Sequence, residues 1–144
     1  MQNTILLVED NIQDEMLILR VLRKNNLANE ITVVRDGQQA LDYLFVEGEF
    51  AQRADPQLPS VVLLDIGLPR VSGLEVLERL RADARTHLLP VVILTSSDEE
   101  RDRLQSYENG ANSFVIKPLD FGAFTETVAR LGVYWLAVNA PLKA

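Results

Sequence analysis

Five polar side chains in this sequence follow directly on short apolar runs. Asp65 ends the run Val61–Leu64 and precedes a loop marked by Gly67 and Pro69. A short unbroken run of β-branched residues and leucines predicts a strand buried on both faces, as in parallel sheets. The other runs end in Glu9 and Asp10 after Thr4–Val8, Thr95 after Val91–Leu94, and Lys117 after Ser113–Ile116. Because parallel strands end at one edge of their sheet, we expect these five side chains to converge there.

Three carboxylates at one place would repel one another and raise at least one pKa, unless a cation lies between them. The chain has no cysteine, and no histidine lies near these strand ends. Carboxylate, carbonyl and water oxygens therefore remain as ligands, and they favour Mg²⁺, with Mn²⁺ also suitable. A metal held by carboxylates beside a hydroxyl and an ammonium indicates phosphoryl transfer. Asp65 would form an acyl phosphate, while Thr95 and Lys117 would each contact a phosphoryl oxygen.

Helical patterns separate the apolar runs. Residues 12–24 carry a buried stripe at helical spacing, a second helix surrounds Leu41 and Leu44, and a third follows Gly73. A strand at Ile31–Val34 lies between the first two helices. Five strands and five helices thus alternate, which predicts an α/β fold with a doubly wound parallel sheet and helices on both of its faces.

The fourth helix is expected to be polar and loosely docked. The pair Ser97 and Glu100 matches a capping box, so the helix should begin at about Asp98 and end near Gly110. Its main apolar anchors are expected to be Leu104 and Tyr107.

The fifth helix is expected to begin after Asp120 and to have two apolar rows. A core-facing stripe is formed by Phe121, Phe124, Val128, Leu131 and Trp135. A second row is formed by Ala129, Val133 and Leu136. A helix that is apolar on two sides usually has another surface to cover. We therefore expect a homodimer through the fourth helix, the fifth strand and the fifth helix, with these three residues in its interface.

The 144 residues, of which 47% are hydrophobic, are sufficient for one domain with a full core. We expect a single domain over residues 1–144, with a long loop at about 47–59 and an extended C-terminal segment at about 120–144. The net charge of -7 argues against nucleic-acid binding. The sequence shows no apolar run long enough to span a membrane and no secretion signal, so a cytoplasmic protein is expected.

With these residues in view, the chain resembles the receiver domain of two-component response regulators along nearly its whole length. The resemblance rests on Val8–Asn11, Asp65–Pro69, Leu94–Ser96 and Phe114–Pro118, each after an apolar strand. It implies the flavodoxin-like (βα)5 receiver fold with strand order 2-1-3-4-5.

The same resemblance implies roles for individual residues. Asp65 accepts a phosphoryl group from a histidine kinase, while Glu9, Asp10, Asp65 and the Gly67 carbonyl arrange Mg²⁺. Thr95 and Lys117 contact the phosphoryl group, Thr95 and Phe114 form the switch, and the Lys117–Pro118 peptide is cis. The protein would be a phosphoacceptor that assists only its own phosphorylation and dephosphorylation, and not an enzyme.

The long loop and the C-terminal segment resemble the single-domain regulators that are paired with bacterial phytochrome histidine kinases. Two alternatives remain open. One is a receiver-like scaffold that is never phosphorylated. The other is an aspartyl-phosphate phosphatase of the haloacid dehalogenase type, although Gly67 stands where that family needs a second aspartate.

Overall fold

The computed structural model describes residues 3–26, 28, 30–54 and 57–142. At its centre is a five-stranded parallel sheet in the order β2-β1-β3-β4-β5. Its strands are β1 (Thr4–Val8), β2 (Glu30–Val34), β3 (Val61–Leu64), β4 (Val91–Thr95) and β5 (Ser113–Ile116). The predicted fold class and strand order are confirmed.

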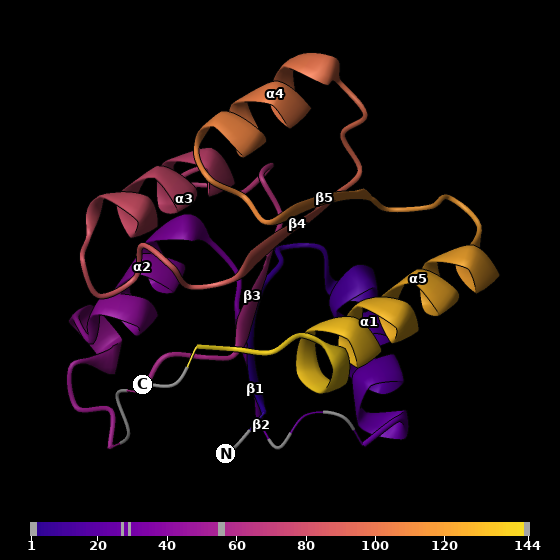
Figure 1. Ribbon diagram of the computed structural model, residues 1–144, viewed down its shortest axis with the longest axis horizontal. Coiled ribbons are helices and arrows are strands. Elements are labelled where there is room, and N and C mark those ends of the chain that lie inside the picture. Colours follow the sequence, from indigo (N-terminus) through magenta and orange to yellow (C-terminus); the bar gives the residue numbers. More distant parts are fainter. Residues whose placement is uncertain (1–2, 27, 29, 55–56, 143–144) are drawn as a thin grey trace.

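Five α-helices alternate with the strands. They are α1 (Ile12–Lys24), α2 (Gly37–Phe45), α3 (Gly73–Ala82), α4 (Glu100–Glu108) and α5 (Phe121–Val133). Figure 1 shows α1 and α5 on one side of the sheet and α2, α3 and α4 on the other. Asn11, Asp36, Ser72 and Asp120 cap four of these helices through side-chain oxygens that accept a backbone N–H three residues on.

Two cores form because neighbouring strand residues point to opposite faces of the sheet. In β3, Val62 and Leu64 pack toward α2 and α3, whereas Val61 and Leu63 pack toward α1 and α5. All four side chains are at most 3% exposed. The central strand that carries Asp65 is therefore held from both sides, and its end is fixed in space.

Aromatic packing holds the first part of the long loop before β3 against α2. It contains a short 3₁₀ helix, Gly48–Phe50, and the Phe50 ring meets Tyr43 of α2 edge to face at 5.2 Å. The Arg53 guanidinium lies 3.9 Å from the centre of the same Tyr43 ring. Residues 55–56 of this loop lie outside the described part of the chain.

The fourth helix corrects two predictions. It begins at Glu100, and its N-cap residue Glu99 makes no side-chain capping bond. The capping box does not form: the Ser97 hydroxyl donates to the Asp102 carboxylate at 2.6 Å, and its oxygen accepts the Glu99 N–H at 3.4 Å, not that of Glu100. Leu104 and Tyr107 are not anchors, since they are 56% and 51% exposed. The only fully buried helix residue is Ser106, whose hydroxyl donates to the Asp102 carbonyl oxygen.

The predicted end of α4 is confirmed. Gly110 has a φ of 91°, a left-handed conformation that glycine adopts without strain. The Gly110 N–H donates to Tyr107 and the Ala111 N–H to Ser106, so the last carbonyls of the helix are satisfied.

The C-terminal segment differs from its predicted helical stripe. After α5 the chain widens into a π-helical turn, Tyr134–Val138, in which the Asn139 N–H donates to the Tyr134 carbonyl five residues earlier. A wider turn changes the angle between successive side chains, and Leu136 is thereby brought into the core at 8% exposure. Leu136 therefore does not belong to a dimer interface, which corrects that prediction.

The start of the predicted stripe is also wrong at one position. Phe121 is 63% exposed, at the first turn of α5, which lies at the end of the helix away from the middle of the sheet (Figure 1). Phe124 and Val128 are buried, and Leu131 and Trp135 are partly buried against the same core, as predicted. Among the described residues, no helix is both long and apolar enough to cross a membrane.

Candidate functional site

The predicted site residues meet at the carboxyl ends of β1, β3, β4 and β5. Carboxylate oxygens of Glu9, Asp10 and Asp65 lie within 4.8 Å of one another. Asp10 and Asp65 line a polar cleft of about 640 Å³ together with Gly67, Thr95, Lys117 and residues of the β4–α4 loop. Glu9 does not line this cleft and is buried at 1% exposure. The convergence predicted from the strand ends is thus observed.

Lys117 joins this cluster through its ammonium group. Its Nζ donates to Glu9 Oε1 at 2.6 Å, to Asp14 Oδ2 at 2.9 Å and to Asp65 Oδ2 at 3.1 Å. An ammonium has three donors, so each has one carboxylate. The side chain is nearly buried at 6% exposure. Burial acts to lower the pKa of Lys117, but the hydrogen bonds to Glu9 and Asp14 and the charge of Asp65 outweigh it and raise the pKa above its usual value. Lys117 is therefore a fixed positive charge.

Glu9 is the most deeply buried carboxyl group of the cluster, at 1% exposure. Burial raises its pKa to about 7, and the charge of Asp65 adds to this effect, against the lowering effect of Lys117. One ammonium thus does not offset three neighbouring carboxylates and a fourth from Asp14. This excess of negative charge, with oxygen ligands only, fits a divalent cation.

Asp65 is oriented by its own loop and by the start of α3. The Gly67 N–H donates to Asp65 Oδ1 at 3.0 Å, which leaves Oδ2 facing Lys117. Gly73, the first residue of α3, packs directly on the Asp65 backbone. A Cβ added at Gly73 would lie 2.2 Å from the Asp65 carbonyl oxygen, so only glycine allows this approach. The sequence marked Gly73 as part of a helix start and gave no sign of this contact.

Thr95 is 2% exposed at the end of β4. Its Oγ1 accepts the Ser97 N–H at 3.3 Å. Phe114 does not line the cleft. Its ring packs against the α2–α3 core and lies 5.8 Å from the Arg103 guanidinium of α4. The two predicted switch residues thus belong to neighbouring strands, with Phe114 next to α4.

The Lys117–Pro118 peptide corrects the prediction of a cis bond, because none of the described peptide bonds is cis. Lys117 reaches the cluster without it. Its backbone N–H donates to the Thr95 carbonyl at 2.7 Å, which continues the pairing of β4 with β5. This pairing already directs the long side chain toward Glu9 and Asp65.

Asp14 is a site residue that the sequence reasoning missed. It lies in the first turn of α1 and not at a strand end, so the strand-end pattern could not select it. Asp10 precedes the helix and its N-cap Asn11, so helical spacing does not link Asp14 to the strand-end residues, and no local signal pointed to it.

The chain matches the model of the response regulator receiver domain over residues 5–129, and it belongs to that family. Among curated proteins it is 42% identical over 135 residues to the probable methanogenesis regulatory protein FilR2 of Methanothrix harundinacea, a match that covers 94% of this chain and 84% of FilR2. It is 34% identical over 132 residues to the response regulator Rcp1 of Synechocystis, covering 92% of this chain and 88% of Rcp1.

Solved structures give the same picture. The phosphorylated cyanobacterial phytochrome response regulator RcpA superposes with a TM-score of 0.92 at 33% identity, covering 99% of this chain and all of RcpA. The Mn²⁺-bound form of Rcp1 gives 0.91 at 31% identity, with 98% and 99% covered. The bacteriophytochrome response regulator RtBRR is 48% identical with a TM-score of 0.77, with 99% and 85% covered. The protein is thus a two-component receiver related to regulators of phytochrome signalling.

Proposed function

We propose that this protein accepts a phosphoryl group on Asp65 from a phosphohistidine of a histidine kinase. The observation that supports this most strongly is the three-way contact of Lys117 Nζ with Glu9, Asp14 and Asp65, which leaves the Asp65 carboxylate at the base of an open polar cleft. An Asp65 oxygen would bond to phosphorus as the phosphorus–nitrogen bond breaks, and the electron pair would leave on the imidazole nitrogen.

The chain's own residues supply most of the charge stabilisation for this transfer. Lys117 would donate to one phosphoryl oxygen and the Thr95 hydroxyl to another, while the Gly67 N–H keeps Asp65 Oδ1 oriented. Glu9, Asp10, Asp65 and the Gly67 carbonyl would hold Mg²⁺, and Mn²⁺ fits the same ligands. When bound, the ion would neutralise phosphoryl charge. The protein would assist only its own phosphorylation and dephosphorylation and would be no enzyme for other substrates.

The kinase partner we propose is a bacterial phytochrome histidine kinase in the cytoplasm. RcpA and RtBRR, whose structures this chain resembles over 99% of its length, are a phytochrome and a bacteriophytochrome response regulator by name. The chain is also related to FilR2, whose name refers to methanogenesis and not to light. The input signal is therefore the first part of this proposal to test. Phosphotransfer from a purified bacteriophytochrome kinase, compared with an unrelated histidine kinase, would do so.

Phosphorylation is proposed to change the α4 surface. Thr95 would move toward the phosphoryl group and Phe114 would follow into the space released. The helix next to Phe114 is weakly docked, because Ser106 is its only fully buried residue. A helix with few buried contacts shifts at low cost in free energy.

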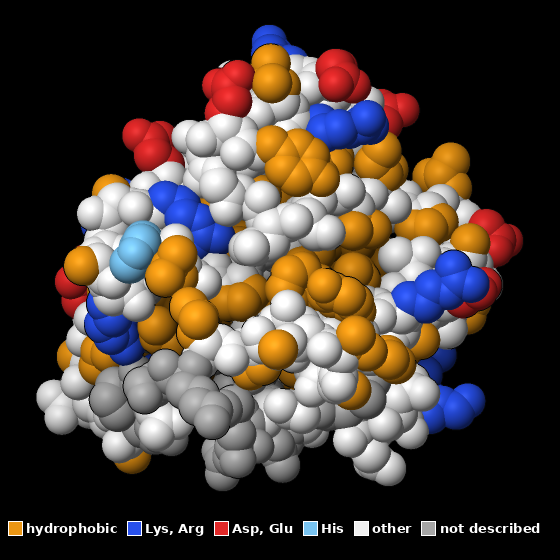
Figure 2. Space-filling model, in the orientation of Figure 1, with side chains coloured by type: hydrophobic (Ala, Val, Ile, Leu, Met, Phe, Trp, Pro, Cys, Tyr) orange, Lys and Arg blue, Asp and Glu red, His pale blue; other side chains and the backbone are white. Residues whose placement is uncertain are grey.

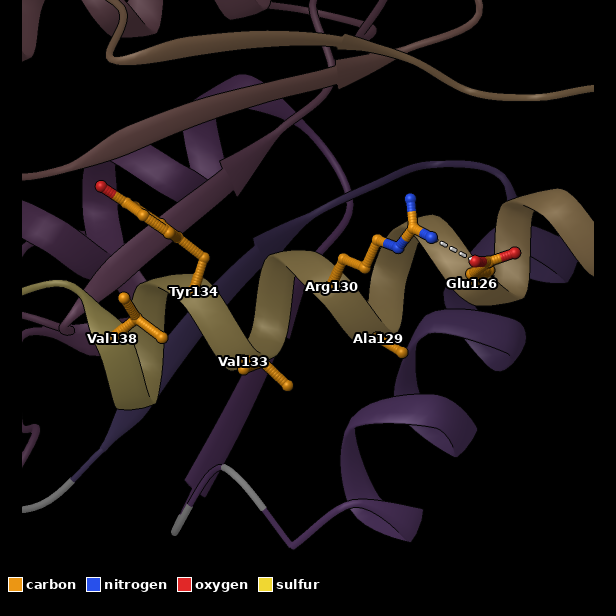
Figure 3. A pocket seen from close by; sticks show the side chains of 6 residues that line it. All are labelled: Glu126, Ala129, Arg130, Val133, Tyr134 and Val138. Carbon is orange, nitrogen blue, oxygen red and sulfur yellow. Dashed lines mark hydrogen bonds and ion pairs between the residues drawn. The ribbon is translucent and has the colours of Figure 1, made fainter.

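The face between α4 and α5 is the surface we propose for homodimerisation. Figure 2 shows hydrophobic side chains gathered across this face. Exposed hydrophobic residues of the elements that form it include Leu104 of α4, Ile116 of β5 and Phe121 of α5. Further along α5, Ala129 and Val133 lie in an apolar groove of about 410 Å³ with Tyr134 and Val138, and Glu126 and Arg130 form an ion pair beside it (Figure 3). In an antiparallel pair of α5 helices, each Glu126 could meet the partner's charge of opposite sign, as a two-fold interface requires.

One experiment separates this function from the scaffold and phosphatase alternatives. The protein is incubated with Mg²⁺ and acetyl phosphate, and its intact mass is recorded with and without hydroxylamine, which cleaves acyl phosphates. We expect one labile phosphoryl group in the wild type and none in Asp65→Asn. Asp83→Asn, an exposed residue after α3, should keep the adduct and serves as the control.

Two other outcomes would favour the alternative functions. Absence of any adduct in the wild type with Mg²⁺ or Mn²⁺ would contradict the proposal and favour a scaffold. Repeated turnover of unrelated phosphate esters would favour a phosphatase.

A further inference from the structure

Lys117 is held by a carboxylate that comes from outside the strand ends. Asp14 Oδ2 lies 2.9 Å from Lys117 Nζ, although the two are 103 positions apart in the sequence. The Asp14 side chain is 26% exposed, and the Lys117 side chain is 6% exposed. Asp14 thus lies between solvent and the Lys117 ammonium group and is the outermost of its three carboxylate partners.

Asp14 is itself fixed by α1. Its backbone N–H donates to the side-chain oxygen of Asn11, the N-cap residue, at 3.0 Å. Asn11 is fixed in turn, because its backbone N–H donates to Glu9 Oε2 at 3.1 Å. The two carboxylates that hold Lys117 beside Asp65, Glu9 and Asp14, are therefore joined through one capping residue.

Asp14 does not belong to the group that could bind a metal ion. Among the described residues that group consists of Glu9, Asp10 and Asp65. Asp14 contacts Lys117 and lines the cleft, so its geometry concerns the ammonium. With two of the three N–H bonds used by Glu9 and Asp14, the third is aimed at Asp65 Oδ2, the oxygen that the Gly67 N–H leaves free.

We propose that Asp14 is a positioning residue, which holds the Lys117 ammonium in the orientation from which it contacts Asp65 and then the phosphoryl oxygen. The effect of Asp14 on phosphorylation rests on the proposed phosphoacceptor function. The positioning of Lys117 by Asp14 does not depend on that function. Without Asp14 the ammonium would lose its outer partner, gain access to water and sample other orientations.

The orientation of Lys117 is tested first by its chemical reactivity. The chain has three lysines, Lys24, Lys117 and Lys143, so an amine-acylating reagent followed by peptide mass spectrometry reports each separately. In the wild type, Lys117 should react much more slowly than Lys24. We expect Asp14→Asn to increase the Lys117 rate several-fold relative to Lys24 in the same sample.

Asp98→Asn is the matched control, because Asp98 also lines the cleft but is not one of the three carboxylates that accept a hydrogen bond from Lys117 Nζ. It should leave the Lys117 labelling ratio unchanged. Thermal unfolding of both variants identifies a general loss of structure, which would raise the labelling rate of buried sites throughout. An unchanged Lys117 ratio in a folded Asp14→Asn protein would overturn the proposal.

The second measurement is the rate of phosphorylation by phosphoramidate with saturating Mg²⁺. We expect Asp14→Asn to lower this rate several-fold, and more than Asp98→Asn does. In a Lys117→Met background the same substitution should have no further effect, since residues acting through one partner are not additive. An equal fall in that background would overturn the role of Asp14 through Lys117.

The two measurements separate this proposal from the proposed function. If the wild type takes up no phosphate but the labelling ratio changes as expected, Asp14 positions Lys117 and the phosphoacceptor function fails. If the wild type is phosphorylated but Asp14→Asn matches it in both labelling and rate, the function stands and the positioning role fails.

Discussion

Glu9 has one carboxylate oxygen on Lys117 and the other on the Asn11 backbone, in a position that is 1% exposed. Burial raises its pKa from the ordinary 4.5 to about 7. In the metal-free protein, the folded state therefore keeps a proton that the unfolded chain releases as the pH rises above 4.5.

This linkage predicts how stability depends on pH. The stabilisation from Glu9 is complete below pH 4.5 and is lost as the pH rises through about 7, because the folded state binds more protons than the unfolded chain in that window. The whole shift corresponds to about 3 kcal/mol of unfolding free energy. We expect urea titrations in the presence of a chelator to show this fall.

The neutral variant Glu9→Gln isolates the effect of this one group. It should be close to the wild type in stability at pH 4.5 and more stable than the wild type at pH 8, both without metal. A difference between the two proteins that stays constant with pH would show that Glu9 is not the titrating group.

At the residue scale, the sequence alone predicted that Asp65 and its neighbours form one site, but it did not predict that Asp14 belongs to this site. Glu9, Asp10, Thr95 and Lys117 each follow an apolar strand, and parallel strands share one edge, so their convergence needed only the fold class. The contact of Asp14 with Lys117 depends on how α1 is placed against the end of β5, which is a tertiary distance that no local pattern contains.

At the element scale, α3 is placed against the site by the absence of one side chain. A Cβ at Gly73 would come 2.2 Å from the Asp65 carbonyl oxygen and 2.5 Å from the Ile66 Cα. Both of these atoms belong to the backbone, so neither can yield by a rotamer change. We expect Gly73→Ala to reduce the free energy of unfolding by about 1–3 kcal/mol and to lower the rate of Asp65 phosphorylation, as measured by urea denaturation and intact mass.

Gly67→Ala is the matched control for that substitution. A Cβ at Gly67 would meet only the Asp65 Oδ1 atom, at 3.7 Å, which is an ordinary van der Waals contact. Its stability should stay within about 0.5 kcal/mol of the wild type. If Gly73→Ala were equally harmless, the close approach of α3 to Asp65 would be refuted.

The two elements that the sequence described least well are those whose ends are set by side-chain competition. The local pattern favours a capping box between Ser97 and Glu100, whereas in the structure the Ser97 hydroxyl donates to Asp102 and accepts the Glu99 N–H. In the C-terminal segment, a regular α-helix predicts Leu136 on the outer row, but the π-helical turn rotates it inward. Both outcomes depend on neighbours that periodicity does not include.

At the scale of the whole molecule, the sheet and the site were predictable together. Three apolar strands, β1, β3 and β4, have buried residues on both faces and require helices on either side. This arrangement leaves the strand ends as the place where polar groups gather. The order of the strands came from the family resemblance, because alternating strands and helices alone are compatible with more than one order.

The outer surface of α5 is where we propose that a second copy of the chain binds. Val133 is 43% exposed and lines the apolar groove of Figure 3. We expect sedimentation velocity at tens of micromolar protein to show a dimer, and Val133→Asp to raise its dissociation constant at least tenfold, or about 1.4 kcal/mol. An unpaired carboxylate in an apolar interface opposes association, while the exposed position leaves the folded monomer intact.

Leu88→Asp provides the comparison, because Leu88 is 61% exposed and lies in the α3–β4 connection, outside the groove. It adds the same charge to an exposed apolar position and should leave the dissociation constant unchanged. Measurements with and without acetyl phosphate then determine whether association depends on Asp65. A wild type that stays monomeric under both conditions, or a Val133→Asp protein that associates as the wild type does, would show that this groove does not pair with a second copy of the chain.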